Sequence, residues 1–339
     1  MSTATVPPVT SSTVHPPHKV FSLSRVTAIA SNTFLELVRL KVFYFLLIFA
    51  LLLIGSSAFM INFTFQEQFQ VLKDVSLGAM SIFTWLLSML ATAMLLPKDI
   101  EDRTLYTILA KPVPRFEYLI GKLGGVLLLL LVSTLVLSAM FLSVLKLRES
   151  IEISRVEAEF SGPVEMIADE PAEGEAAAAP KGSAQQKEEL EQREKARQER
   201  KQAAIQDIKS NTFTWSLLPG ITCIYLKAAL FASLTLLIST FASSWIFTIV
   251  TSVAVYFIGT IQSIAREYWN SADVSPLTDI FLKLIVLVFP DLQLFNLVDD
   301  IVAGNPISTL LFMKTAALGC IYILVYLFLA YFIFSNKEL

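Results

Sequence analysis

The 339-residue chain has little of the chemistry on which enzymes and metal sites depend. Its two cysteines, Cys223 and Cys320, lie in apolar runs without partner spacing, so neither a disulfide framework nor a zinc site is indicated. Its two histidines, His15 and His18, both lie near the N-terminus. The sequence contains no G-x-x-x-x-G-K-[ST] phosphate loop, no HExxH motif and no nucleophile elbow. We therefore expect a chain that is not an enzyme by itself and that binds no metal or cofactor.

Charge is also scarce outside one block. Of 26 basic and 29 acidic residues, 25 lie within residues 148–209, which leaves 30 charges in the other 277 residues. A hydrophobic share of 55% and a mean hydropathy of +0.64 exclude an ordinary soluble domain. The net charge of −3 provides no basic surface for nucleic acid. Residues 1–20, rich in Pro, Ser and Thr, are expected to form a disordered cytoplasmic tail and not a secretory signal.

What the chain does contain is long apolar runs. A helix needs roughly 20 apolar residues to cross the hydrocarbon core. Six runs qualify: residues 42–61, 75–97, 119–145, 217–241, 245–264 and 308–334. The sequence therefore predicts an all-α membrane protein, with three transmembrane helices in residues 21–147 and three in residues 211–339. The run 280–290, which contains Lys283, is too short to span, so segment 280–307 is predicted to be re-entrant or interfacial.

Lysine and arginine in the short flanking segments predict the orientation. With the N-terminus inside, three of them lie outside: Lys73, Arg266 and Lys283. Ten lie inside: Lys19, Arg25, Arg39, Lys41, Lys98, Arg103, Lys111, Arg115, Lys122 and Lys337. Both termini are thus predicted to be cytoplasmic, in a bacterial inner membrane, with the insert 148–210 outside. None of the six runs contains an acidic residue, which argues against a proton or sodium relay.

The insert is predicted to have two parts. Residues 161–183, rich in Ala, Glu, Pro and Gly, read as a linker. Residues 184–208 consist mostly of strong helix formers with opposite charges near i,i+4 spacing. Their apolar positions keep no convincing heptad, so the helix is either solvated on its own or contacts a coiled-coil or extracytoplasmic protein partner.

The predicted cytoplasmic loop 98–117 carries the most specific pattern outside the apolar runs. Pro97 can open a helix, and acidic residues follow it near the positive end of the helix dipole. Pro112 disfavours helical structure in the residue before it, so we predict about three turns over Asp99–Ala110. Ile100, Leu105, Ile108 and Leu109 give this helix an apolar side. It either rests on lipid headgroups or docks a cytoplasmic partner.

Residues 100–125, I-E-D-R-T-L-Y-T-I-L-A-K-P-V-P-R-F-E-Y-L-I-G-K-L-G-G, resemble the signature of ABC-2 type transporter permeases. In that family the loop carries an E-x-x-T-L…K-P-V-x-R…G-K pattern and forms the coupling helix. The resemblance implies that the loop contacts an ABC ATPase subunit. The coupling residues that it implies are Ile100, Glu101, Arg103, Thr104, Leu105, Ile108, Leu109, Lys111, Pro112 and Arg115.

The resemblance extends to other segments. Residues 22–41 are similar to the family's amphipathic elbow helix, and their basic residues also suit anionic lipid headgroups. Residues 289–304 resemble its outer half-helix region. The family architecture implies a second permease protomer, as a homodimer, and two copies of a separate ATPase that binds ATP and Mg. The charged insert 148–209 departs from simple members, which join these crossings by a short loop.

Two functions remain open at this point. One is the permease subunit of an ATP-driven exporter whose substrate is unidentified. The other is a non-transporting membrane anchor or assembly factor that recruits a partner through its outer charged helix. Within the predicted spans Lys227 stands out, because a lysine deep in a span either extends to the membrane surface or lines a polar translocation path.

Overall fold

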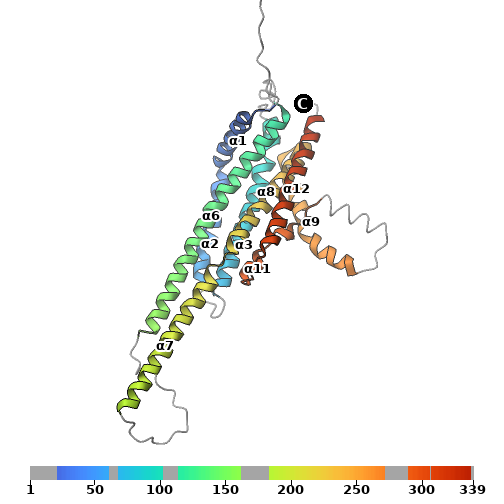
Figure 1. The fold of residues 1–339 in the computed structure, drawn as a ribbon. Helices are drawn as coiled ribbons and strands as arrows, with labels where there is room; N and C mark the ends of the chain where they lie inside the picture. Colours follow the sequence, from blue (N-terminus) through green and yellow to red (C-terminus); the bar gives the residue numbers. More distant parts are fainter. Residues whose placement is uncertain are drawn as a thin grey trace, which may run out of the picture.

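The computed structural model describes residues 21–60, 68–101, 114–161, 183–271, 289–305 and 307–336. All regular elements in these ranges are helices, as predicted for an all-α protein (Figure 1). In chain order they are α1 (Leu23–Val38), α2 (Lys41–Met60), α3 (Gln68–Ala93), α4 (Leu95–Glu101), α6 (Arg115–Glu159), α7 (Ser183–Thr212), α8 (Leu217–Phe241), α9 (Trp245–Ser271), the 3-10 turn η3 (Leu292–Phe295), α11 (Val298–Val302) and α12 (Thr309–Asn336).

Five of the described helical segments are long and apolar enough to cross a membrane. A sixth is obtained when α1 and α2, which meet at a bend of 68°, are counted together as one span. The six predicted runs thus correspond to α2, α3, α6, α8, α9 and α12. The agreement is closest for α8, whose bounds match the predicted 217–241. Length and apolar content therefore support a multi-pass helical membrane protein.

Helix α8 lies at the centre of the bundle and packs against α12, α3, α6 and α9. Its central position explains its composition, because a helix that is apolar on all sides has no face to present to water. Its small residues, among them Ala228, Ala232 and Ser233, are buried and allow neighbouring helices to approach closely. The main core cluster joins α8 to α2, α3 and α6 through fully buried side chains such as Leu77, Phe141 and Leu236.

Helix α1 packs along the first turns of α6. Its buried residues Val26, Thr33 and Leu37 recur at helical spacing, so one face of α1 covers α6 and the other is left exposed. The contact depends on Gly121 and Gly125, where α1 comes so close that a side chain would collide with it. These glycines therefore allow α1 to lie directly against α6.

Helix α6 continues well beyond the predicted span 119–145. Its 45 residues correspond to about 68 Å, more than twice the roughly 30 Å of a hydrocarbon core. Residue 148, the predicted start of the insert, therefore lies inside this helix. Helix α7 runs back beside the extension of α6, and the two form a hairpin that projects from one end of the bundle (Figure 1). Helix α7 is thus not a lone helix, because Lys201 lies 3.9 Å from Glu157 of α6.

Lys73 was predicted to lie in an outer loop, but the structure places it within a helix. It lies in α3, is buried, and its Nζ donates a 2.6 Å hydrogen bond to the carbonyl oxygen of Asn211. Asn211 is in the last turn of α7, where helix carbonyls lack partners and a cation is favourable. Lys73 therefore fastens the base of the hairpin to α3. Arg266 likewise lies within helix α9, which runs past the predicted end at 264 to Ser271.

The segment between α9 and α12 is described only from Phe289 onward. The short apolar run 280–290 and Lys283 therefore lie almost wholly outside the described residues. From Phe289 the chain forms η3 and α11, whose buried side chains Phe295 and Ile301 pack into the bundle. Gly220 of α8 makes room for Ile301, since an added Cβ would lie 1.9 Å from its Cδ1.

Candidate functional site

The end of the bundle opposite the hairpin carries α1, α4, the start of α6 and the end of α12 (Figure 1). We call this the loop end, because the predicted coupling loop leaves and re-enters the bundle there. Side chains from α1, α4 and α6, all but one of them charged and most of them buried or half-buried, meet at this end. We call them the loop-base network: Arg25, Glu36, Lys98, Asp99, Arg115, Glu117, Tyr118 and Lys122.

Glu117 in the first turn of α6 is the anchor for α1. Its carboxylate is buried and accepts hydrogen bonds from Arg25 Nε at 2.6 Å and Nη2 at 2.8 Å. It also accepts a 2.7 Å bond from the backbone N–H of Ser22, the residue before α1. A fork of two nitrogens on one carboxylate fixes orientation as well as distance. Glu117 therefore sets where α1 begins relative to α6.

Lys122, one turn further along α6, reaches α4. Its Nζ lies 2.6 Å from Asp99 Oδ2, and both side chains are nearly buried. The hydroxyl of Tyr118 donates a short hydrogen bond to the same carboxylate oxygen. Glu36 of α1 completes the group, since it lies 3.1 Å from Lys98 and 3.8 Å from Lys122. Helices α1, α4 and α6 are thus joined through opposite charges at the point where the loop leaves the bundle.

Arg115, at the other end of the loop, connects it to α12. Its Nη1 donates to the carbonyl oxygens of Phe334 at 2.9 Å and Ser335 at 2.8 Å. The guanidinium also lies 5.8 Å from the centre of the Phe334 ring, which stacks near Tyr118. The last carbonyls of a helix lack intrahelical partners and carry partial negative charge, so an arginine satisfies them well. One end of the loop is therefore held by an ion pair with α6, and the other by hydrogen bonds to the carbonyl end of α12.

The predicted coupling residues fall into three groups. Arg115 is described and lies in the loop-base network. Ile100 and Glu101 lie in α4, whose first residue is Leu95, so this helix starts before the predicted Asp99 and Pro97 falls in its first turn instead of opening it. The remaining predicted residues lie outside the described part of the chain: Arg103, Thr104, Leu105, Ile108, Leu109, Lys111 and Pro112.

Glu117, Lys122 and Asp99 were not predicted as site residues. One signal was available, since Glu117 and Lys122 are charges at the start of a long apolar helix, where burial demands a partner. Which partner each one has depends on the path of α1 and α4, and no spacing rule gives that.

Lys227 lies in the interior of the bundle. It is half-buried on α8 and lines a small cavity together with other residues of α8 and residues of α3, α9 and η3: Ser81, Thr84, Trp85, Ile224, Ala228, Phe231, Tyr256 and Leu292. No carboxylate is among these residues. The indole nitrogen of Trp85 is buried and has no hydrogen-bond partner in the described part of the chain.

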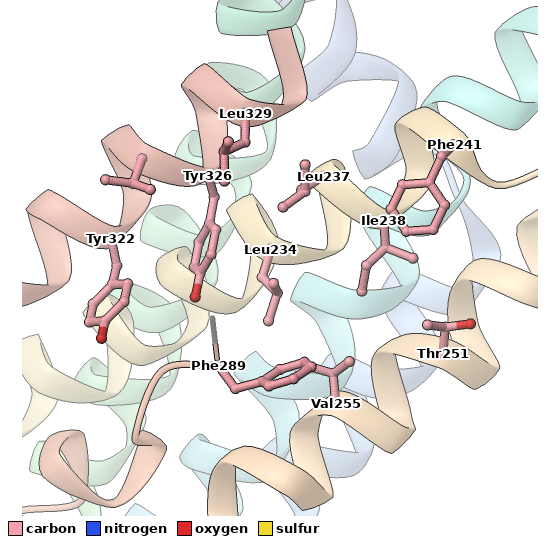
Figure 2. A pocket seen from close by; sticks show the side chains of 11 residues that line it. Leu234, Leu237, Ile238, Phe241, Thr251, Val255, Phe289, Tyr322, Tyr326 and Leu329 are labelled. Atoms are coloured by element: carbon pink, nitrogen blue, oxygen red, sulfur yellow. The ribbon is translucent and has the colours of Figure 1, made fainter. Parts of the chain in front are cut away.

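A larger apolar pocket of about 600 Å³ lies between α8, α9 and α12 (Figure 2). Figure 2 shows Leu234 and Ile238 of α8 facing Tyr326 of α12, with Phe289 closing the space near Val255 of α9. Among the described residues that line it, the side-chain polar groups are the hydroxyls of Thr251, Tyr322 and Tyr326. Its size falls within the roughly 300–1,000 Å³ typical of ligand sites.

The chain was compared with known protein families. The model of the family described as ABC-2 family transporter protein matches residues 53–332, which is most of the chain. The chain belongs to the ABC-2 transporter family. A search of curated proteins returns no match. The predicted family resemblance is thereby confirmed, and this ABC-2 protein is a multi-pass membrane permease of an ABC transporter.

Family membership also indicates which subunit of the transporter hydrolyses ATP. An ABC-2 protein is the transmembrane component and not itself the ATPase, so this permease has an ABC ATPase subunit as its partner.

Proposed function

We propose that this permease couples ATP hydrolysis to export through the loop that runs from α4 to α6. The observation that carries the proposal is the loop-base network. It ties the two ends of the loop to each other and to a third helix, with Asp99 of α4 held by Lys122 of α6 and Arg115 of α6 held by the end of α12. A loop that merely joined two crossings would need no such fastening.

The proposed mechanism follows from these contacts. Two copies of the partner ATPase bind ATP and Mg and close, and the segment Asp99–Ala110 moves with them. Because α4 follows α3 with a break only at Met94, displacement of α4 acts on α3 directly. Lys73 at the far end of α3 is bonded to Asn211, so the movement extends to the hairpin of α6 and α7. Switching between discrete packings of this kind is how small local shifts become large ones.

Docking on the partner tests the proposal. Truncation of Leu105 together with Ile108 to alanine is expected to release the ATPase, because apolar anchors at the centre of an interface can cost roughly 2 kcal/mol or more when removed. Arg103→Ala is the control, since a rim charge chiefly changes association rate and salt dependence. ATPase co-purification and transport would be measured in the same preparations. Full retention of both by the Leu105→Ala, Ile108→Ala double variant would refute the docking role and leave this segment on the lipid surface.

We also propose that the loop end is cytoplasmic and the hairpin end outside, in a bacterial inner membrane. The excess of basic residues in the predicted inner segments supports this orientation. A cysteine at Ser183, in the first turn of α7, is expected to react with a membrane-impermeant maleimide in intact cells. Cys320 of α12, kept as the reference site within a spanning helix, should remain unlabelled. Labelling at position 183 only after permeabilisation would reverse the orientation.

The architecture that we propose is a homodimer of this permease with two ATPase subunits, with α1 as the elbow helix on the cytoplasmic lipid surface. Arg39 and Lys41, which follow α1 directly, and the bend of α1 against α2 support that placement. The rival function, an anchor that recruits an extracytoplasmic protein, is favoured by the hairpin alone, where Leu147 and Ile151 of α6 are exposed. An anchor of this kind would need no docked ATPase, so the Leu105/Ile108 experiment separates the two functions.

A further inference from the structure

The cavity around Lys227 offers hydrogen-bond donors without an acidic partner. Lys227 lies ten residues from the start of α8, about 15 Å along its axis, which is near the middle of a spanning helix. No ion pair or hydrogen bond joins its ammonium group to any described residue. Trp85 adds an indole N–H that is likewise unsatisfied within the described ranges. A charge inside a membrane bundle is costly when unpaired, so these donors fit a ligand that brings the acceptor.

The space beside Lys227 limits what that acceptor is. About 10 Å³ is open to the centre of a water-sized group, which is room for one such group. The cavity therefore has room beside Lys227 for about one oxygen atom of an acidic group, and more of a ligand enters only if a lining side chain moves.

Helix α8 leads from this cavity to the apolar pocket. Lys227, Phe231, Leu234, Ile238 and Phe241 follow one another at spacings of four and three residues, so they share one face of the helix. The first two line the small cavity, and the last three line the 600 Å³ pocket. Lys227 and Leu234 are two turns apart, about 10 Å along the axis. One helix face thus offers a positive charge at one end and an apolar pocket at the other.

Aromatic rings occupy the junction of the two spaces. Trp85 packs on Tyr256 with ring centroids 4.2 Å apart, and Tyr256 meets Phe231 edge-on at 5.7 Å. Phe231 is fully buried between Lys227 and Leu234 on the α8 face. A ligand that reaches both spaces must displace the Phe231 ring. Because Trp85 lies in the same aromatic cluster, its fluorescence is expected to change when a ligand enters.

We propose that this site binds an amphipathic acid, with its apolar body in the α8–α9–α12 pocket and its single anionic group at Lys227. The proposal rests on the proposed transport function only in treating this acid as the cargo. Anionic lipids of the bilayer have the same chemistry, but their headgroups lie at the membrane surface and not at its mid-depth. A cargo molecule drawn into the bundle fits the position of Lys227 better.

The test uses the purified permease in nanodiscs of zwitterionic lipid, with Trp215, Trp245 and Trp269 replaced by Phe so that Trp85 is the sole tryptophan and can be excited selectively over the tyrosines. A fatty acid brominated in mid-chain is expected to quench Trp85 at about tenfold lower mole fraction than the alcohol of the same chain. Lys227→Met should abolish this preference, while Lys227→Arg should keep most of it. Lys314→Met is the matched control, because Lys314 is exposed on α12 and lines neither space.

Leu234→Phe probes the apolar part separately. It should weaken quenching by acid and alcohol alike, because it fills the pocket and leaves the charge in place. Equal quenching by acid and alcohol in the chain with Lys227, or a preference that survives Lys227→Met, would overturn the site. If a brominated anionic phospholipid quenches as well as the acid, the ligand is a bilayer lipid and the assignment to cargo fails. None of these readouts involves the ATPase, so a failed docking experiment leaves them unchanged.

Discussion

Gly125→Ala is expected to loosen α1 from α6 and destabilise the permease, whereas Gly124→Ala should be silent or slightly stabilising. A Cβ at Gly125 would lie 2.6 Å from Thr33 Cβ and 2.7 Å from the backbone oxygen of Ala30. A backbone atom cannot move aside as a flexible side chain does, so α1 must shift as a unit. At Gly124 the nearest atom, Ala30 Cβ, would be 3.6 Å away, which is ordinary contact. Overpacking of this kind costs about 1–3 kcal/mol.

Gly124 is a matched control for Gly125, because the two glycines are adjacent in the same helix. Both substitutions raise the intrinsic helix propensity of α6 by the same amount, since alanine is favoured over glycine in a helix interior by up to about 1 kcal/mol. Any difference between them therefore reports the contact with α1. Thermal stability in one detergent and ATPase co-purification would be measured for both variants. Equal stability of Gly125→Ala and Gly124→Ala would mean that α1 does not rest on α6 as the structure has it.

The helices themselves were predictable because a membrane span is specified by composition over a long stretch. Residues 217–241 and 308–334 each contain a single lysine and no other charge, and their helices begin and end within two residues of the predicted bounds. Where the apolar run ends but helix formers continue, the same rule fails. Residues 146–159 mix charged and apolar side chains, and these charges ended the predicted span. The helix nevertheless continues to Glu159, because α7 packs beside this part of α6.

The loop-base network was predictable only in part. Arg115 was expected from the family signature, and the structure places it among the network residues. Glu117 and Lys122 belong to the same quoted segment, but their partners are Arg25 and Asp99, which lie 92 and 23 positions away in the chain. Pairing across such separations depends on how α1 crosses α6 and where α3 breaks into α4. Lys73 shows the same limit, since its charge suggested a loop while its bond to Asn211 requires burial.

Lys122→Met is expected to be among the most damaging single substitutions at the loop end. Lys122 and Asp99 lie 2.6 Å apart with side chains only 6% and 11% exposed, and the substitution leaves the Asp99 carboxylate buried with Tyr118 as its remaining donor within the loop-base network. Removal of one partner of a buried pair typically costs about 3–5 kcal/mol. Lys98→Met provides the control, because Lys98 pairs with Glu36 at 3.1 Å but is 45% exposed. Exposed pairs contribute about 0–1 kcal/mol, so this variant should remain close to the unmodified protein.

A double-mutant cycle of Asp99 and Lys122 separates the effect of this ion pair on protein stability from its effect on coupling to transport. Asp99→Leu combined with Lys122→Met removes both charges and is expected to recover most of the lost thermal stability, because a buried ion pair replaced by apolar residues is often neutral or stabilising. Transport is expected to stay low in the double variant, since the Asp99–Lys122 link between α4 and α6, through which movement of the loop reaches the bundle, is then lost. Stability in detergent, ATPase co-purification and transport would be compared across the four proteins of the cycle. If the double variant regains transport together with stability, the pair serves packing alone and the coupling path must run through Arg115 and α12.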